Sequence, residues 1–169
     1  ASELAQAVQI IREVSDLPLF VDADTGFGNE ENAVRTMRML EAAGASAIQL
    51  EDQVFPKRCG FMAGKAVIPA ADYADKLKAV LDTRRGATLV IARTDARSIE
   101  GFEAALARAA LYAETGADLI FVEGPESREE MQAISARLGK DFPLVHNLVE
   151  GGVSPVTSAR ELAELGYAV

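Results

Sequence analysis

The sequence predicts an α/β fold in which strands and helices alternate and the strands pair in parallel. Short apolar runs alternate with longer segments whose apolar residues recur at helical spacing. The runs cover residues 17–24, 47–50, 88–92, 119–122 and 143–145. Strict alternation requires crossover helices between successive strands, which makes neighbouring strands parallel. Each run also ends in a charged or amide side chain, at the edge where α/β proteins bind ligands.

The composition indicates one acidic globular domain over residues 1–169. The chain is 49% hydrophobic, which is enough for a substantial core. Its net charge of −9, without a Lys/Arg-rich run, makes nucleic acids and anionic membranes poor partners. The single cysteine excludes an internal disulfide, and no apolar run approaches the roughly 18 residues of a membrane span. Glu3, Arg12 and Glu13 interrupt any signal-peptide core, so we expect a cytoplasmic protein.

The first half of the chain is predicted to form two β/α units. Apolar spacing indicates a helix over residues 2–15, followed by a strand over 17–24. Asn29 is a favourable N-cap for the next helix, and Gly44 is a favourable C-cap. A second strand, 47–50, precedes a segment from Gln53 to Ile68 that lacks periodicity. A loop of that length in a compact domain is typical of a lid or binding loop.

The second half repeats the pattern. We expect a helix over about 70–83, a strand over 88–92 and a helix that ends at Gly116. The strand at 119–122 is followed by a capping pattern, Ser127 with Glu130, for a helix reaching Leu138. After the strand at 143–145, Ser158 and Glu161 predict another cap for a helix that ends at Gly166. Residues 167–169 are interpreted as the start of a sixth strand.

Charged or amide residues at the strand ends favour the prediction of a barrel over that of a flat sheet. These residues are Asp22, Asp24, Glu51, Arg93, Glu123 and Asn147. A flat sheet would spread them along one edge, whereas a barrel gathers them at one mouth, where they can form a site. The structural alternative for each residue is that strand ends carry polar side chains because they meet solvent.

Asp22 and Asp24 are the first candidates for a metal site. Two residues apart on an extended chain, they project to the same side and can address one cation, directly or through water. Oxygen ligands of this kind suit Mg²⁺. The alternative is an ordinary turn that ends a strand, because Asp followed by Gly is common there.

Four motifs follow one another along the chain: Val21-Asp22-Ala23-Asp24-Thr25-Gly26-Phe27-Gly28, Gln49-Leu50-Glu51-Asp52-Gln53, Lys57-Arg58-Cys59-Gly60 and Ala92-Arg93-Thr94-Asp95-Ala96. In order and spacing they resemble the isocitrate lyase/phosphoenolpyruvate mutase superfamily, in its methylisocitrate lyase-like branch. The resemblance implies a (β/α)8 TIM-type barrel, which takes roughly 250 residues. The 169 residues are therefore expected to be an incomplete segment of about five to six β/α units. The resemblance also implies that the full-length protein is a homo-oligomer.

The resemblance implies roles for individual residues. Asp22, Asp24 and Glu51 would form the Mg²⁺ shell, with Mn²⁺ as an alternative ion. Arg93 would contact the substrate carboxylate and the developing oxyanion, and Gly60, Glu123 and Asn147 would bind the rest of the substrate. Cys59 would be the general acid/base. Lys57 and Arg58 beside it can lower its pKa and supply thiolate, although a lone cysteine is more commonly an inert buried residue.

The implied activity is Mg²⁺-dependent cleavage of a 2-hydroxy di- or tricarboxylate by a retro-aldol step, of the methylisocitrate or alkylmalate type. The products would be an α-keto acid and a carboxylate. Phe61 stands where lyases of the family usually carry histidine, which puts the substrate in question. The alternatives are an oxaloacetate-type decarboxylase, a hydrolase or a phosphoenolpyruvate/phosphonate mutase of the same superfamily. A non-catalytic barrel fragment is the alternative from another class.

Overall fold

The computed structural model describes residues 1–59, 62, 64–149 and 154–169, and within them the strands form one parallel sheet. The sheet order equals the chain order, and every neighbouring pair is parallel. This confirms the predicted α/β class with a parallel sheet. The strands are β1 (Phe20–Asp22), β2 (Ala47–Glu51), β3 (Leu89–Thr94), β4 (Leu119–Val122) and β5 (Leu144–Val145).

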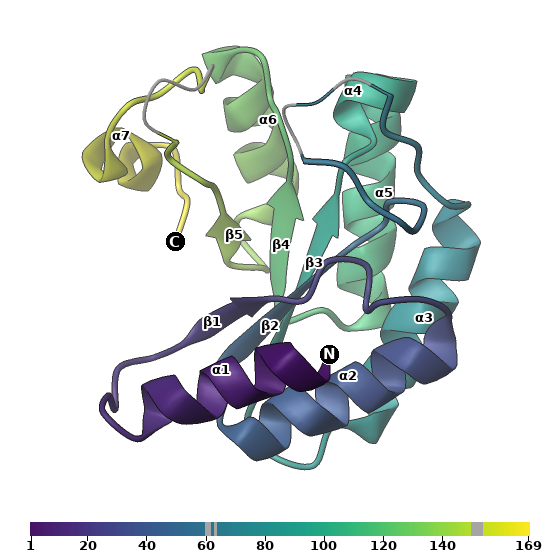
Figure 1. Cartoon of the computed structure of the whole chain (residues 1–169). Helices are drawn as coiled ribbons and strands as arrows, with labels where there is room; N and C mark the ends of the chain where they lie inside the picture. The colour runs from purple at the N-terminus through teal and green to yellow at the C-terminus, as the bar shows by residue number, and fades with distance from the viewer. Residues whose placement is uncertain (60–61, 63, 150–153) are drawn as a thin grey trace.

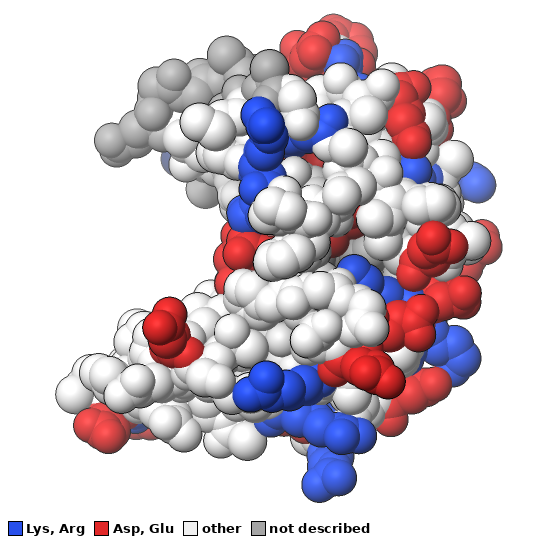
Figure 2. Space-filling view, turned by 45° about the vertical axis from the view of Figure 1, so that its right-hand side comes forward, with Lys and Arg blue, Asp and Glu red and all other residues white. Residues whose placement is uncertain are grey.

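The helices lie around the outside of this curved sheet, and the other face of the sheet lines a deep hollow (Figures 1 and 2). No helix in the described part of the chain combines the length and apolar character that a membrane crossing requires. The helices are α1 (Ser2–Arg12), α2 (Glu30–Ala43), α3 (Ala70–Thr83), α4 (Arg97–Glu100), α5 (Phe102–Thr115), α6 (Arg128–Leu138) and α7 (Ala159–Glu164).

The predicted caps of the helices are confirmed. The Asn29 side chain accepts a hydrogen bond from the main-chain N–H of Asn32, and Gly44 adopts a left-handed conformation at the end of α2. The Ser127 and Ser158 side chains likewise cap α6 and α7. Local signals thus determined where these helices begin and end.

The ends of two predicted elements are wrong. The first helix stops at Arg12, and the first strand covers only Phe20–Asp22. Arg12 instead binds carbonyl oxygens of the loop between them, with Nη1 2.6 Å from the oxygen of Leu17. At the other end of the strand, Asp24 has a left-handed φ of 50°, and a β-strand cannot extend through a residue in this conformation.

Two further differences lie later in the chain. The short helix α4 was not expected from the sequence. Residues 167–169 are not a strand, although they run beside β5. The N–H of Ala168 donates to the oxygen of Leu144 at 2.9 Å, and the N–H of His146 donates to the oxygen of Val169 at 2.9 Å.

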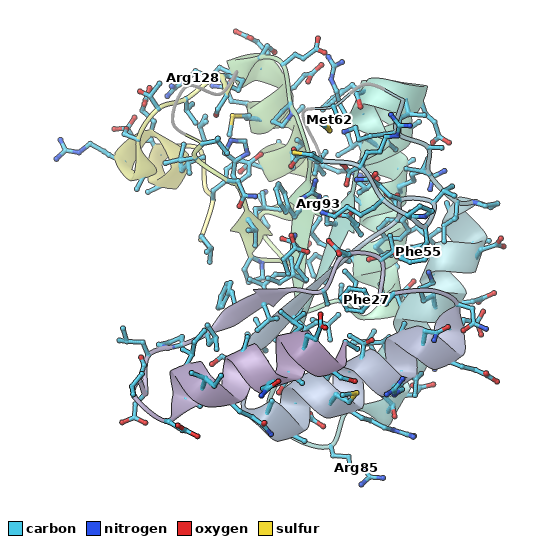
Figure 3. The ribbon with its side chains drawn as sticks, viewed as in Figure 1. Phe27, Phe55, Met62, Arg85, Arg93 and Arg128 are labelled. Atoms are coloured by element: carbon cyan, nitrogen blue, oxygen red, sulfur yellow. The ribbon has the colours of Figure 1, made fainter. Side chains whose placement is uncertain are left out.

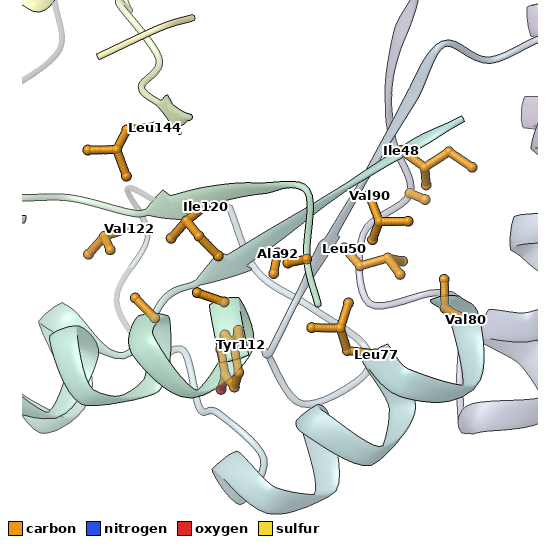
Figure 4. Packing of buried hydrophobic residues seen from close by; sticks show 14 of the residues in the cluster. Ile48, Leu50, Leu77, Val80, Val90, Ala92, Tyr112, Ile120, Val122 and Leu144 are labelled. Carbon is orange, nitrogen blue, oxygen red and sulfur yellow. The ribbon is translucent and has the colours of Figure 1, made fainter. Parts of the chain in front are cut away.

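Alternation along the strands divides the sheet residues between two environments. One face packs against the helices, where Leu77 of α3 and Tyr112 of α5 are fully buried (Figure 4). Its strand residues include Ile48, Leu50, Val90, Ala92, Ile120 and Val122. A separate cluster, Ala47, Ile91, Leu119, Phe121 and Val145, comes from the alternate positions. Because successive residues face opposite sides, Glu51, Arg93 and Glu123 share the side of this second cluster, away from the helices.

Asp52 faces the helix layer and joins two strands to α5. Its carboxylate is fully buried and accepts hydrogen bonds from the Thr94 hydroxyl at 2.7 Å and the Asp95 N–H at 2.9 Å. The Tyr112 hydroxyl donates at 2.8 Å, and the Arg108 guanidinium donates at 3.3 Å. Burial raises the pKa of Asp52, and these donors oppose that shift. The carboxylate therefore satisfies four buried donors at once.

We expect Asp52→Ala to lower the free energy of unfolding by about 3 kcal/mol, because it leaves several buried donors without an acceptor. Tyr112→Phe removes only one of those donors and is expected to cost about 1 kcal/mol. Denaturant unfolding of the full-length protein measures both values. Equal losses in the free energy of unfolding for the two variants would contradict the conclusion that Asp52 accepts hydrogen bonds from several buried donors.

Candidate active site

The site residues are set side by side by the register of the sheet. Glu51 is the pairing partner of Arg93 between β2 and β3, and Arg93 is the partner of Phe121 between β3 and β4. Figure 3 shows Arg93 in the middle of the sheet, and acidic side chains lie at the base of the hollow (Figure 2). Of the strand-end residues expected to converge, Glu51 and Glu123 lie beside Arg93.

Arg93 is a buried cation that contacts several carboxylates at the carboxyl edge of the sheet. Its Nε and Nη2 donate to the two carboxylate oxygens of Asp95 at 2.9 and 3.1 Å. Its guanidinium also lies 3.5 Å from a Glu51 oxygen and 3.6 Å from a Glu123 oxygen. The Cζ atom is 5.1 Å from the ring centre of Phe121. The planar guanidinium is thus held in one orientation among three carboxylates.

Glu51 is the most unusual carboxylate of the cluster. Its side chain is fully buried, and neither oxygen has a hydrogen-bond partner among the described residues. Burial raises the pKa of Glu51 from 4.5 to about 7, with the charges of Asp95 and Asp22 adding to the effect and those of Arg93 and Lys57 opposing it. A carboxylate without hydrogen bonds in a buried position is chemically suited to a metal ion.

Lys57 lies between the carboxylates predicted to bind the metal. Its Nζ is 2.8 Å from Asp24 Oδ1 and 3.8 Å from Glu51 Oε1. Burial opposes the charge of Lys57, but the hydrogen bond to Asp24 and the charges of Glu51 and Asp22 raise its pKa overall. The Lys57 ammonium therefore lies where the negative potentials of Asp22, Asp24 and Glu51 overlap.

The loop after β1 connects the two aspartates to β2. The N–H of Asp24 donates to Asp22 Oδ1 at 2.9 Å, and the carbonyl of Asp24 accepts from the N–H of Glu51, also at 2.9 Å. Asp22 itself is exposed, whereas Asp24 is half-buried. The loop thus presents two carboxylates of different accessibility beside Glu51.

A metal would have to be held partly through water. Within the described ranges, no three His, Cys, Asp or Glu side chains converge closely enough to coordinate one ion. Mg²⁺ commonly takes one or two protein carboxylates and keeps several waters. The unpartnered oxygens of Glu51, with Asp24 and Asp22 nearby, fit that mode of binding.

The two ends of the long loop between β2 and α3 pair with each other, and the loop contacts the carboxylates near Arg93. Gln53 forms an antiparallel bridge with Val67, and its side chain binds the main chain of Arg58. Lys65 Nζ lies 3.1 Å from Asp95 Oδ1. Two lysines of one loop, Lys57 and Lys65, therefore pair with carboxylates at the ends of three strands, β1, β2 and β3.

The other predicted site residues are less closely connected. Cys59 is exposed on the same loop, and Asn147 is exposed after β5. Over the described parts of the chain, no side-chain hydrogen bond or ion pair joins either residue to the Arg93 cluster. Beside Asn147, His146 Nε2 is 2.9 Å from Ser154 Oγ. Gly60, Phe61 and Glu150 lie outside the described residues.

Sequence reasoning missed Asp95 and Lys65. Asp95 had a usable signal, because it follows Arg93 by two residues and alternation places both on one side of the strand. Lys65 had none, because it lies in a segment without periodicity and reaches Asp95 only through the fold of the loop.

A parallel β/α sheet with charged residues clustered at its carboxyl edge is the arrangement of a β/α barrel with its site at the strand ends. Residues 1–169 match the family described as phosphoenolpyruvate phosphomutase. The chain belongs to the PEP mutase/isocitrate lyase superfamily.

Relatives and solved structures agree on this membership. The 2-methylisocitrate lyase of Aeropyrum pernix is 48% identical over 168 residues, which are 99% of this chain and 54% of that protein. A crystal structure of 2,3-dimethylmalate lyase matches with a TM-score of 0.93 and 35% identity, over 98% of this chain and 56% of that one. A structure of phosphonopyruvate hydrolase with oxalate and Mg²⁺ matches with a TM-score of 0.80 and 30% identity, over 96% and 56%. The chain thus spans about half the length of the proteins it matches.

We expect Glu51→Gln to remove a pH-dependent loss of stability in the metal-free protein. The pKa of Glu51 is higher in the folded state than its ordinary 4.5, so its contribution to stability is largest below pH 4.5 and declines as pH rises through about 7. The glutamine variant lacks this decline. Relative to the wild type, its free energy of unfolding should rise by on the order of 3 kcal/mol between about pH 4.5 and pH 8.

Denaturant unfolding of the full-length protein in the presence of a chelator measures this difference. Glu103→Gln, at an exposed position on α5, is the matched control and should follow the wild type at every pH. A constant difference between Glu51→Gln and the wild type across this pH range would contradict the raised pKa.

Proposed function

We propose that the full-length protein is a Mg²⁺-dependent carbon–carbon lyase that cleaves a 2-hydroxy di- or tricarboxylate of the methylisocitrate or alkylmalate type. The observation that carries the proposal is the buried Glu51 carboxylate, whose oxygens have no hydrogen-bond partner among the described residues and which lies beside Lys57 and Arg93. The similarity to a 2-methylisocitrate lyase and to a 2,3-dimethylmalate lyase supports the reaction class. The match to a structure that contains oxalate and Mg²⁺ supports the metal.

Asp22, Asp24 and Glu51 would hold the Mg²⁺, or Mn²⁺ in its place, partly through water. The bound ion would stabilise negative charge on the oxygen atoms of the α-keto acid portion of the substrate. Lys57 lies beside the same carboxylates and would move away from them or share them when the ion binds. A single positive charge from Lys57 only partly compensates three nearby carboxylates.

Arg93 would bind a substrate carboxylate and the developing oxyanion. Asp95 fixes the plane of its guanidinium by two hydrogen bonds, which orients the remaining donors before substrate arrives. Glu123 lies next to this guanidinium, and Asn147 follows the neighbouring strand, so both are proposed to position the rest of the substrate. Gly60 is proposed as a main-chain contact.

The retro-aldol step moves one proton at each end of the breaking bond. The substrate hydroxyl gives its proton to a solvent water molecule, and the carbon that carries it becomes the carbonyl of the α-keto acid. The electron pair of the broken carbon–carbon bond passes to the carbon beside the departing carboxylate. The Cys59 thiol, exposed on the loop between β2 and α3, is proposed to protonate that carbon.

A hydrolase or decarboxylase of the same superfamily is the second candidate. It is favoured by the match to phosphonopyruvate hydrolase, which covers nearly the whole chain. A phosphoenolpyruvate/phosphonate mutase would use the same carboxylates, and a non-catalytic barrel fragment would use none of them. We also propose a small carboxylate as substrate, a homo-oligomeric full-length protein and, from the single cysteine, a cytoplasmic location.

We expect Cys59→Ser to lower kcat/KM for keto-acid release at least about 100-fold, because the product carbanion loses its proton donor. The rate at which deuterium from D2O enters the carboxylate product should fall in parallel. Val54→Ala, at an exposed position on the same loop, is the control and should retain activity. Full activity in the Cys59→Ser variant would favour a hydrolase or decarboxylase that needs no thiol.

We expect chelation to abolish keto-acid release and added Mg²⁺ to restore it. The assay uses the full-length protein with a panel of 2-hydroxy di- and tricarboxylates. Calorimetry with oxalate, in the presence and absence of Mg²⁺, tests the metal without turnover. Turnover that survives chelation would refute the metal site, and the absence of Mg²⁺-dependent oxalate binding would favour the non-catalytic alternative.

A further inference from the structure

The loop that carries Asp24 has an unfavourable main-chain conformation. Asp24 has a φ of 50° and Phe27 a φ of 63°, in the left-handed region that side chains other than glycine rarely adopt. A conformation of this kind persists only where surrounding contacts hold it. The contacts that hold residues 23–28 therefore determine where the Asp24 carboxylate lies.

One of these contacts comes from α2. The Thr36 hydroxyl donates to the carbonyl oxygen of Gly26 at 3.2 Å, and both groups are buried. Gly26 itself packs against Ala33, because a Cβ added at Gly26 would lie 2.7 Å from the Cβ of Ala33. The middle of the loop is thus attached to α2.

The second contact comes from α3 and spans the loop. Lys76 Nζ donates to the carbonyl oxygen of Gly28 at 2.9 Å and to that of Thr25 at 3.3 Å. Lys76 is only 7% exposed, and burial lowers the pKa of its ammonium while the charge of Glu30 opposes that shift. One ammonium group therefore holds the two carbonyls that flank Gly26 and Phe27.

The same helix also contacts the strand that carries Glu51. The Tyr73 hydroxyl donates to the carbonyl oxygen of Leu50 at 2.6 Å, directly before Glu51 in β2. Tyr73 and Lys76 are three residues apart on α3 and so lie on one side of the helix. Helix α3 thus binds the main chain next to both Asp24 and Glu51.

We propose that Lys76 is a positioning residue for the metal site, which holds the Asp24 loop from the helix side at the separation from Glu51 that a divalent ion requires. The inference rests on the proposed function. Lys76 acts through the main chain of residues 25–28, because its ammonium donates to the carbonyl oxygens of Thr25 and Gly28. Its loss would therefore change the geometry of the carboxylates and leave their number and charge unchanged.

The effect of Lys76 on stability can be separated from its effect on the loop. An apolar side chain of similar length avoids the desolvation penalty of the buried ammonium but leaves the carbonyls of Thr25 and Gly28 without this donor, so the two effects on stability oppose each other. A structural lysine would lower stability when replaced. A positioning lysine would instead lower metal affinity while stability stays nearly constant.

The experiment compares Lys76→Met with the wild type in the full-length protein. Calorimetric titration with Mg²⁺ alone is expected to give a Kd at least about tenfold weaker for the variant, as is typical when a residue that orients metal ligands is lost. The midpoint of thermal unfolding in chelator should stay within about 2 °C of the wild type or rise. At saturating Mg²⁺, kcat should fall more than KM rises.

Lys78→Met is the matched control, because Lys78 lies on the same helix in an exposed pair with Asp82. It should leave Kd for Mg²⁺, kcat and the unfolding midpoint unchanged. Thr36→Val removes the contact from α2 and is expected to weaken Mg²⁺ binding in the same direction by a smaller factor. It serves as the second variant if Lys76→Met does not fold.

An unchanged Kd for Mg²⁺ in Lys76→Met, or in Thr36→Val where the first variant is unfolded, would overturn the inference. Where Lys76→Met lowers both affinity and stability, Lys76→Arg decides, because it retains a buried cation with donors. Recovery of the Mg²⁺ affinity supports the inference, and recovery of stability without affinity contradicts it. A wild-type protein that binds no Mg²⁺ contradicts the proposed function itself.

Discussion

The concave side of the sheet depends on the compensation of buried charge around Arg93. Its guanidinium lies among Glu51, Asp95 and Glu123, each of which is nearly or fully buried. Carboxylates so close together would repel one another in a medium of low polarity without that cation. Burial nevertheless raises the pKa of both glutamates, so the compensation is incomplete. The remaining negative potential favours the binding of a cation at this edge of the sheet.

The helix layer supports this arrangement from the opposite side. Glu51 and Asp52 are adjacent in the chain, yet one faces the hollow and the other accepts hydrogen bonds from α5 and β3. Asp52 thereby fixes the position of Asp95, whose side chain orients Arg93. A chain of contacts thus connects the packed interior to the charged cluster. Residues in the helix layer influence the geometry of the Arg93 cluster by this route.

Much of the fold could be predicted because its signals are local. Caps at Asn29, Ser127 and Ser158 act over one helical turn, and the alternation of strands and helices determines parallel pairing. The error at the first strand has a different origin. The strand starts late because Arg12 binds the carbonyl of Leu17, and it ends early because Asp24 adopts a left-handed conformation. Neither feature follows from the apolar pattern of residues 17–24.

By itself, the sequence determined which residues reach the carboxyl edge of the sheet and, by alternation, which of them share a face. Side chains alternate between the two faces every two residues along a strand, so the face of each residue can be predicted without knowing its neighbours in the fold. Tertiary structure alone decided that Lys57 lies between Asp24 and Glu51, that Lys65 pairs with Asp95 and that Lys76 holds the Asp24 loop. These contacts join residues separated by long stretches of chain, and their geometry depends on how loops and helices pack around the sheet.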